Sequence, residues 1–304
     1  MVGQDGRSAW PVGGKIQQTI GQWARRGIGL NAILLVGHGS VRREVMGDAN
    51  RDPTPEELAR MKALVREAMD GGAWGISTGL SYVPGRFAKT EEVIALTAEV
   101  KPYGGFYISH LRNQGDRLLE SVDETIRIGR ETGVTVVATH FKSSGRANFG
   151  KARAALERID AARRAGVRIY TDVYPWATSS DGIDVDVLPA EVYRIAGEPD
   201  PDATRAREAV RRATGLAAEI MGLEDRGLLR PGQAADIVIF DPLTIDACAT
   251  YRNPHCYSRG VAYLLVNGTL AIDQGKYTGA LAGRVLLRPR RALPAAAPTG
   301  GGQR

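Results

Sequence analysis

The sequence predicts an α/β protein: part of an eight-stranded (β/α)8 barrel, with about five barrel strands, followed by a small antiparallel β module. Three observations predict this fold class. Short apolar runs alternate five times with longer segments of helical periodicity. The runs are continuously apolar, which is typical of parallel strands covered by helices. From about residue 225 the apolar residues instead alternate with a period close to two. A doubly wound open sheet is the second fold that the pattern allows.

The five barrel strands are expected at residues 31–38, 73–80, 105–110, 134–140 and 167–175. The helix after the first strand carries clear signals at both of its ends. Thr54 is its expected N-cap, Pro55 occupies the first helical position, and Glu57 completes a capping box. Gly71 or Gly72 is expected to end this helix.

Three more helices are expected between the later strands. The first begins with Thr90 as its cap and stops before Pro102. The second, residues 116–133, is amphipathic and ends at Gly133, and the third covers residues 151–166. Polar and titratable residues gather at the C-terminal ends of the strands, which is the edge where α/β barrels place their active sites.

The C-terminal part of the chain has the alternating apolar pattern of antiparallel strands. Asn267 and Gly268 stand between two apolar runs and predict a hairpin turn. The expected domains are therefore a partial barrel at residues 1–222, a small β-sandwich module at residues 223–288 and a disordered tail at residues 289–304.

Composition excludes several classes of protein. The chain has 304 residues, of which 43% are hydrophobic and 24% charged, as in globular proteins. Its net charge is +6, but the basic residues form no block, so we expect no binding to nucleic acid. No apolar run is long enough to cross a membrane, and the first residues lack the pattern of a signal peptide, so we expect neither. The two cysteines, Cys248 and Cys256, cannot staple a chain of this size and fit a reducing compartment. We therefore expect a cytoplasmic protein.

A pair of histidines is the strongest chemical signal in the pattern. His110 and His140 each end an apolar run, and one helix lies between them. In a barrel this spacing places both imidazoles on the same rim, on neighbouring strands, where they suit zinc. The alternative is two unrelated histidines at strand ends. Because a catalytic zinc normally has three protein ligands, the spacing alone leaves both interpretations open.

The other two histidines are weaker candidates. His38 also ends an apolar run, but its Gly-His-Gly context favours a backbone turn over a metal ligand. His255, next to Cys256, precedes the hairpin and is interpreted as a structural or surface residue.

Several motifs together resemble one enzyme family. The stretches "NAILLVGHGSVRREVMG", "GISTGLSYVPG", "YISHLRNQG", "VVATHFKSSG" and "YTDVYPW" are similar to N-acyl-D-amino-acid deacylases (D-aminoacylases) of the amidohydrolase superfamily. So are "GLAAEIMGLEDRGLLRPGQAADIVIFDPLTI" and "GVAYLLVNGTLAIDQGKYTGALAGRVL". The resemblance covers most of residues 20–288 in two blocks. It implies a metal-dependent barrel with a small β-sandwich, which hydrolyses the amide of an N-acylated D-amino acid.

The resemblance also implies roles for individual residues. His110 and His140 correspond to the zinc ligands on the fifth and sixth barrel strands. The zinc is expected to polarise the amide carbonyl and to activate water. The residues implied to line the substrate site, holding its carboxylate or the developing oxyanion, are Tyr82, Lys142, Tyr174 and Ser180. Taken alone, the two tyrosines fit rim aromatics, the lysine a solvent-facing side chain and the serine a turn.

The chain departs from the family pattern at four places. It has no His-x-His pair for a first strand, no cysteine in the context of a second, and neither the general-base aspartate nor the following arginine of an eighth. Asp181 lies only seven residues after Tyr174, too close for a crossover to another strand, so we interpret it as a loop residue. We therefore expect a chain shortened at its N-terminus and in its interior.

These departures predict impaired catalysis. Loss of a general base typically costs about 10²–10⁴ in rate, or roughly 3–5 kcal/mol of barrier. Five strands also cannot close an eight-stranded barrel, and exposed sheet edges would allow association with another chain. The alternatives are a non-catalytic remnant or interaction protein, and a cyclic-amide hydrolase of the same superfamily.

Overall fold

Two β-sheets organise the part of the chain that the computed structural model describes, residues 13–173, 203–242, 244–246, 248 and 256–288. The first sheet contains β1 (Val36–Gly37), β2 (Gly75–Gly79), β3 (Phe106–His110), β4 (Thr135–Thr139) and β5 (Ile169–Thr171). All neighbouring pairs are parallel, and the order in space is β1-β2-β3-β4-β5. A spatial order that follows the chain order is that of a barrel, because a doubly wound sheet reverses its order at one point. The prediction of a partial barrel with five parallel strands is confirmed.

The first and last of these strands are shorter than predicted. The run at residues 31–38 was expected to be a strand throughout, yet only Val36 and Gly37 are. Ala32 pairs instead with Val285 near the end of the described chain. His38 directly follows the end of β1, as expected, and is also the first residue of helix α2 (His38–Met46). Gly37 is the N-cap of this helix, and its backbone is still extended, with φ −85° and ψ 119°.

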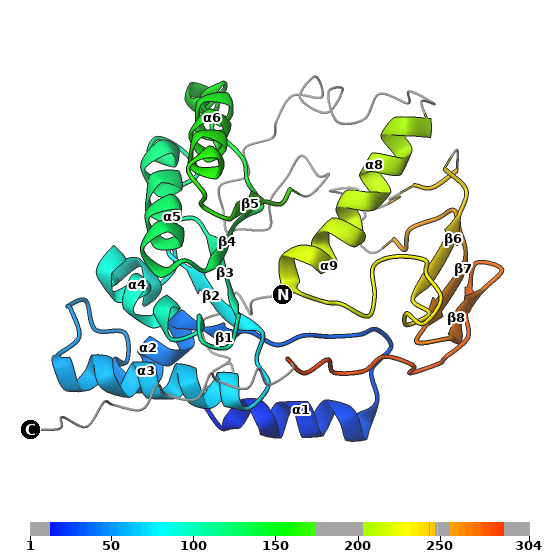
Figure 1. Cartoon of the computed structure of the whole chain (residues 1–304), viewed down its shortest axis with the longest axis horizontal. Helices are drawn as coiled ribbons and strands as arrows, with labels where there is room; N and C mark the ends of the chain where they lie inside the picture. Colours follow the sequence, from blue (N-terminus) through cyan, green and yellow to red (C-terminus); the bar gives the residue numbers. More distant parts are fainter. Residues whose placement is uncertain (1–12, 174–202, 243, 247, 249–255, 289–304) are drawn as a thin grey trace, which may run out of the picture.

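Helices cover one face of the parallel sheet. They are α3 (Pro55–Asp70), α4 (Thr90–Ala98), α5 (Leu118–Thr132) and α6 (Lys151–Arg164), with α1 (Lys15–Arg26) packed beside α3. Figure 1 shows α4, α5 and α6 standing side by side along the sheet. Buried apolar side chains from the strands, such as Ile76 and Val136, meet buried side chains from the helices, such as Val93, Val122 and Ile159. Most residues of β2, β3 and β4 are buried, as their unbroken apolar runs predicted.

The predicted helix ends hold with one exception. Thr54 caps α3 through the full capping box with Glu57, and Gly133 ends α5 in the left-handed conformation. Thr90, however, is the first residue of α4, whose N-cap is Lys89. The Thr90 hydroxyl donates to Glu124 of α5 at 2.8 Å, so it joins two helices instead of capping its own.

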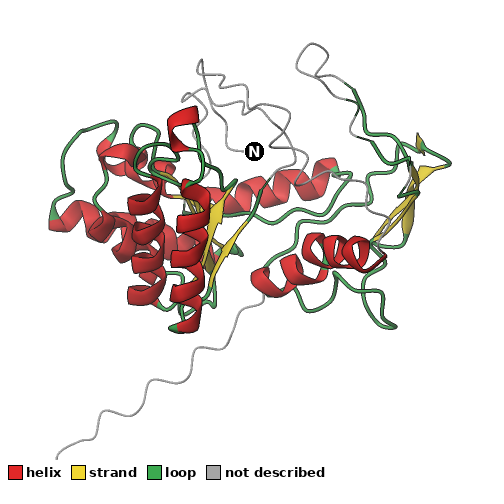
Figure 2. Cartoon of the chain, turned by 90° about the horizontal axis from the view of Figure 1, so that it is seen from above, coloured by secondary structure: helices red, strands yellow, loops and turns green. Residues whose placement is uncertain are grey.

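The second sheet is antiparallel and holds β6 (Ile237–Phe240), β7 (Val261–Val266), β8 (Thr269–Asp273) and β9 (Lys276–Tyr277). The predicted turn at Asn267 and Gly268 joins β7 to β8, and both residues have positive φ, as a tight hairpin requires. Helices α8 (Ala203–Ala213) and α9 (Gly215–Met221) precede this sheet in the chain. Both views place the sheet at the opposite end of the molecule from α4–α6 (Figures 1 and 2).

After the antiparallel sheet, the end of the described chain returns to the part of the molecule that holds the parallel sheet, called the first unit below. Ile28 bridges to Gly283, and the Trp74 ring nitrogen donates to the Leu286 carbonyl at 2.6 Å. The Asn31 side chain also contacts Asp236 and Asn267 of the antiparallel unit. The domain boundary at residue 222 stays a prediction, and the tail at residues 289–304 lies outside the described residues.

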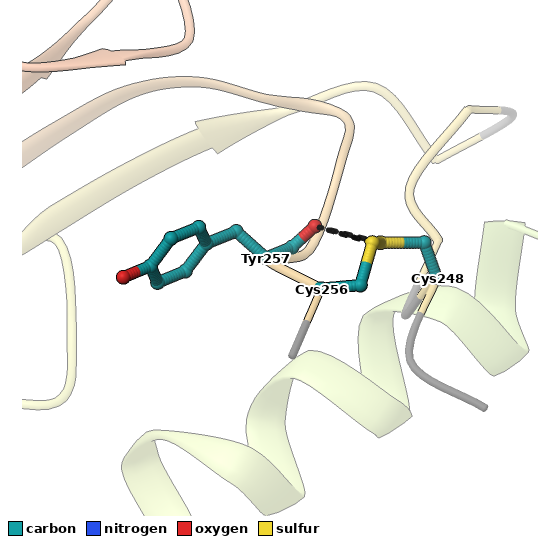
Figure 3. The surroundings of a disulfide bond; sticks show 3 residues. All are labelled: Cys248, Cys256 and Tyr257. Carbon is teal, nitrogen blue, oxygen red and sulfur yellow. Dashed lines mark hydrogen bonds between the residues drawn. A yellow bond between two sulfur atoms is a disulfide. The ribbon is translucent and has the colours of Figure 1, made fainter. Parts of the chain in front are cut away.

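The two cysteines form a disulfide between Cys248 and Cys256, eight residues apart (Figure 3). The carbonyl oxygen of Tyr257 lies against this bridge. The bond closes a short local loop and joins no distant elements, so it agrees with the expectation that these cysteines do not staple the fold. A disulfide is nevertheless uncommon in the reducing compartment that the low number of cysteines was expected to indicate.

Among the helices of the described segments, none is both long and apolar enough to cross a membrane.

Candidate functional site

The two rim histidines meet at the C-terminal edge of the parallel sheet. His110 is the last residue of β3, and His140 directly follows β4. His110 is in register with Gly79 of β2 and Thr139 of β4. The Nδ1 atom of His110 lies 3.0 Å from the Nε2 atom of His140, and the ring centroids are 4.5 Å apart. The structure thus brings together the pair that was expected to share one rim, while their role as metal ligands stays a prediction.

Tyr82 completes one side of this pair. Its hydroxyl lies 3.3 Å from His110 Nδ1, and its ring centroid lies 4.7 Å from that of His110. The ring rests directly on the backbone of Gly79, where an added Cβ would lie 2.8 Å from a ring carbon. The loop that carries Tyr82 is held from α2 by Arg43, which donates to the Val83 carbonyl at 3.0 Å.

The other residues implied to bind substrate are only partly described. Lys142 lies two residues beyond His140 and is partly buried. Tyr174 and Ser180 lie outside the described residues, as do Asp181 and His255. The roles expected for these four residues therefore stay predictions.

Two residues at the site were not predicted from the sequence. The Gln114 amide nitrogen lies 3.0 Å from His140 Nδ1 and donates to the His140 carbonyl at 3.2 Å. The carboxylate of Asp172 accepts hydrogen bonds from the Thr139 hydroxyl, at 2.8 and 2.6 Å, and from the His140 backbone N–H. One signal could have found Asp172: it follows the last residue of β5 just as His140 follows the last residue of β4.

His38 belongs to a separate, buried cluster of charges. Its Nε2 atom lies 2.8 Å from Glu92, whose other carboxylate oxygen accepts from Arg42. Both His38 and Arg42 have no exposed surface, and Glu92 has 5%. Burial raises the pKa of Glu92, but hydrogen bonds and positive charge from His38 and Arg42 outweigh burial and hold that pKa below its ordinary value. The cluster joins α2 to α4, which favours the structural interpretation of His38.

The spacing of the histidine nitrogens fits two neighbouring positions around a tetrahedral zinc. Two nitrogens bound at about 2.0–2.1 Å lie about 3.3–3.4 Å apart in that geometry. The observed 3.0 Å is close to that separation. Within the described segments no third His, Cys, Asp or Glu joins the pair to make a cluster of metal-binding size. The described residues therefore fit part of a zinc shell.

The chain is similar in sequence to proteins of one known family. Residues 120–272 match the model of the amidohydrolase family. The D-aminoacylase of Alcaligenes xylosoxydans xylosoxydans is 33% identical over 342 residues, which cover 85% of this chain and 70% of that protein. The N-acyl-D-aspartate deacylase of the same organism is 32% identical, over 87% of this chain and 70% of the relative.

A solved structure agrees with these matches. It is the N-acyl-D-glutamate deacylase of Bordetella bronchiseptica, complexed with zinc and a phosphonate inhibitor that mimics the tetrahedral intermediate. It is 27% identical, with a TM-score of 0.81 over 90% of this chain and 75% of that one.

The length of the first match bears on the expected shortening. An aligned stretch of 342 residues is longer than the whole 304-residue chain, so the relative holds residues within it that have no counterpart here. This agrees with the predicted shortening of the interior. The order of the strands, the family model and both relatives lead to one assignment: the chain belongs to the amidohydrolase family, among the D-aminoacylases and N-acyl-D-amino-acid deacylases.

Proposed function

We propose that this protein binds zinc through His110 and His140 and hydrolyses the amide bond of N-acylated D-amino acids. The observation that carries the proposal is the 3.0 Å approach of the two imidazole nitrogens at the C-terminal edge of the sheet. Parallel barrels place catalytic groups at that edge. The substrates named for the family relatives supply the substrate class.

Zinc bound here would supply Lewis-acid polarisation of the amide carbonyl and an activated water. The side chains around it would bind and orient the substrate. The Tyr82 hydroxyl lies beside His110 and can donate to an oxygen of a bound substrate. Lys142, together with Tyr174 and Ser180, is proposed to hold the substrate carboxylate, because an ammonium group and hydroxyls are suitable partners for an anion.

The general base remains unassigned. The carboxylate of Asp172 lies beside His140, but both of its oxygens accept hydrogen bonds from Thr139. No aspartate beyond it is proposed as a base. We therefore propose that turnover is slow relative to a complete member of the family, by the factor of about 10²–10⁴ typical of a missing base.

Metal content and turnover test this proposal together. The purified chain is expected to contain zinc and to deacylate N-acetyl-D-amino acids but not their L-enantiomers. A panel of apolar, aspartate and glutamate side chains would identify the preferred substrate. Removal of zinc by a chelator, and the His110→Ala and His140→Ala variants, are expected to abolish turnover. Tyr82→Phe is the matched variant that keeps both histidines and should keep the zinc.

Each of the other outcomes rejects the proposal in a recognisable way. A zinc-free oligomer without turnover would favour a non-catalytic interaction protein, with the sheet edges of β1 and β5 as the first surfaces to examine. Hydrolysis of a cyclic amide, with N-acetyl-D-amino acids left intact, would favour a cyclic-amide hydrolase of the same superfamily.

A further inference from the structure

His140 has an uncommon backbone conformation. Its φ is +40°, in the left-handed region that few residues other than glycine adopt. Among the described residues only Asn267 and Gln274 share this property without being glycine, and both lie at turns between strands of the antiparallel sheet. A strained conformation persists only where the surrounding structure imposes it. Something at the end of β4 must therefore hold His140 in place.

Asp172 is the residue that contacts this turn at three consecutive positions. Its carboxylate accepts from the Thr139 hydroxyl and from the His140 N–H, and its backbone carbonyl accepts from the Phe141 N–H at 2.8 Å. Asp172 directly follows β5, the strand that pairs with β4, so it reaches the turn from a neighbouring strand of the sheet. One residue, directly after a strand of the parallel sheet, thus contacts the chain on both sides of His140 and at His140 itself.

Gln114 is the second residue that holds His140. Its amide contacts both the carbonyl oxygen and Nδ1 of His140, and its own carbonyl accepts from the Ser144 N–H at 2.7 Å. Gln114 is 9% exposed. Between them, Asp172 and Gln114 bind the N–H, the carbonyl and one ring nitrogen of His140. The remaining ring nitrogen, Nε2, is left facing His110.

We propose that Asp172 is a positioning residue for the zinc site: it holds His140 in the left-handed conformation that turns Nε2 toward His110. This proposal rests on the proposed zinc function. Without the Asp172 carboxylate, the Thr139 hydroxyl and the His140 N–H lose their acceptor, and only the backbone bond from Phe141 to Asp172 stays. The φ of His140 then relaxes toward negative values, and the imidazole leaves the position that faces its partner. Residues that orient metal ligands typically change metal affinity by about 10–100-fold when they are removed.

Zinc affinity, measured by competition with a chromophoric chelator, tests the role of Asp172 without any need for turnover. Asp172→Ala is expected to weaken zinc binding by about 10–100-fold. Asp172→Asn keeps a carbonyl oxygen for the His140 N–H and is expected to restore most of the affinity. Asp160→Ala is the matched control, because Asp160 is an exposed carboxylate in the last turns of α6 that pairs with Arg163 at 3.3 Å.

Amide hydrogen exchange of the metal-free protein supplies a second readout. The His140 amide is expected to exchange at least about tenfold faster in Asp172→Ala than in the wild type, since it loses its acceptor. Circular dichroism would confirm that each variant is folded. A folded Asp172→Ala variant with wild-type zinc affinity and wild-type exchange at His140 would overturn the proposal. If the wild type itself binds no zinc, the proposed function fails, and exchange at His140 alone decides whether Asp172 holds the turn.

Discussion

A single hydrogen atom on Gly79 decides where the Tyr82 ring can lie. The ring rests on the Gly79 backbone and faces His110 across 4.7 Å. Protein interiors and close contacts of this kind leave no room for an added methyl group. The absence of a side chain at Gly79 thus allows Tyr82 to lie beside the histidine pair.

Gly79→Ala is therefore expected to displace Tyr82. The new Cβ would lie 2.8 Å from a ring carbon, so the ring must move away from His110. Nuclear magnetic resonance of the His110 ring protons would show the loss of the ring-current shift from Tyr82. Tyr82→Phe keeps the ring and loses only the hydroxyl, so it should preserve most of that shift. Wild-type His110 shifts in Gly79→Ala would contradict this account.

The sequence predicted the histidine pair but not the residues that hold it. His110 and His140 were found because both end apolar runs one β/α unit apart, and Tyr82 because its motif resembles a family. Gln114 and Asp172 lie 26 and 32 residues from His140, in loops without periodicity. Their roles depend on which strands are neighbours, and a pattern along one chain carries that information only after the sheet order is known.

Helix ends are the elements that the sequence specified most fully. The capping box of α3 satisfies two backbone N–H groups: Glu57 N–H donates to Thr54 Oγ1 at 3.2 Å, and Thr54 N–H donates to the Glu57 carboxylate at 2.8 Å. Both partners are three residues apart, so the local sequence contains the whole motif. Strand lengths were predicted less well. The lengths of β1 and β5 depend on how many of their residues pair with the neighbouring strands β2 and β4, and the local sequence does not contain that information.

Thr54→Ala is expected to lower the free energy of unfolding by about 0.5–2 kcal/mol, since one N–H of the first turn of α3 loses its acceptor. Urea unfolding followed by circular dichroism would measure the change. Thr54→Ser retains the hydroxyl and should remain close to the wild type. Equal stability of the alanine and serine variants would show that the cap contributes nothing.

The buried carboxylate of Glu92 joins two helices that the sequence could not pair. Glu92→Gln would leave Arg42 and His38 buried without their anion, which typically costs about 3–5 kcal/mol. Because the folded state holds the pKa of Glu92 below its ordinary value of about 4.3, the stabilisation is present above that pH and is lost as the pH falls through the lowered pKa.

The stability difference between wild type and Glu92→Gln is therefore expected to be largest near neutral pH and to shrink in acid. Urea unfolding at a series of pH values from 7 to about 3 would measure it. Glu91→Gln is the matched control, because the neighbouring Glu91 carboxylate is exposed and pairs with Arg127 on the surface. A difference that stays constant as the pH falls would show that ionised Glu92 is not the source of the stabilisation.

At the scale of the whole molecule, the sequence predicted two kinds of sheet but not how they are joined. The five parallel strands and the hairpin at Asn267 follow from patterns within about 30 residues. The connection between the units instead pairs residues 28–32 with residues 283–286, about 250 positions later in the chain. Such a contact has no local signal. Only the structure shows that the end of the described chain lies against the beginning of the first unit.

Gly283→Ala is expected to open this connection. A Cβ at Gly283 would lie 2.1 Å from the Leu30 carbonyl oxygen, a backbone atom that cannot turn aside as a side chain could. The pairing of Gly283 with Ile28, and of Ala32 with Arg284 and Leu286, should be lost with it. Hydrogen exchange would show faster exchange at the amides of Gly283, Ala32 and Leu286, while the amides of β3 and β4 stay protected. Gly14→Ala is the control, because a Cβ at Gly14 would meet no atom within 4 Å. Wild-type exchange at those three amides in Gly283→Ala would mean that the pairing tolerates a side chain at Gly283, and that it is not the close backbone approach that joins the two units.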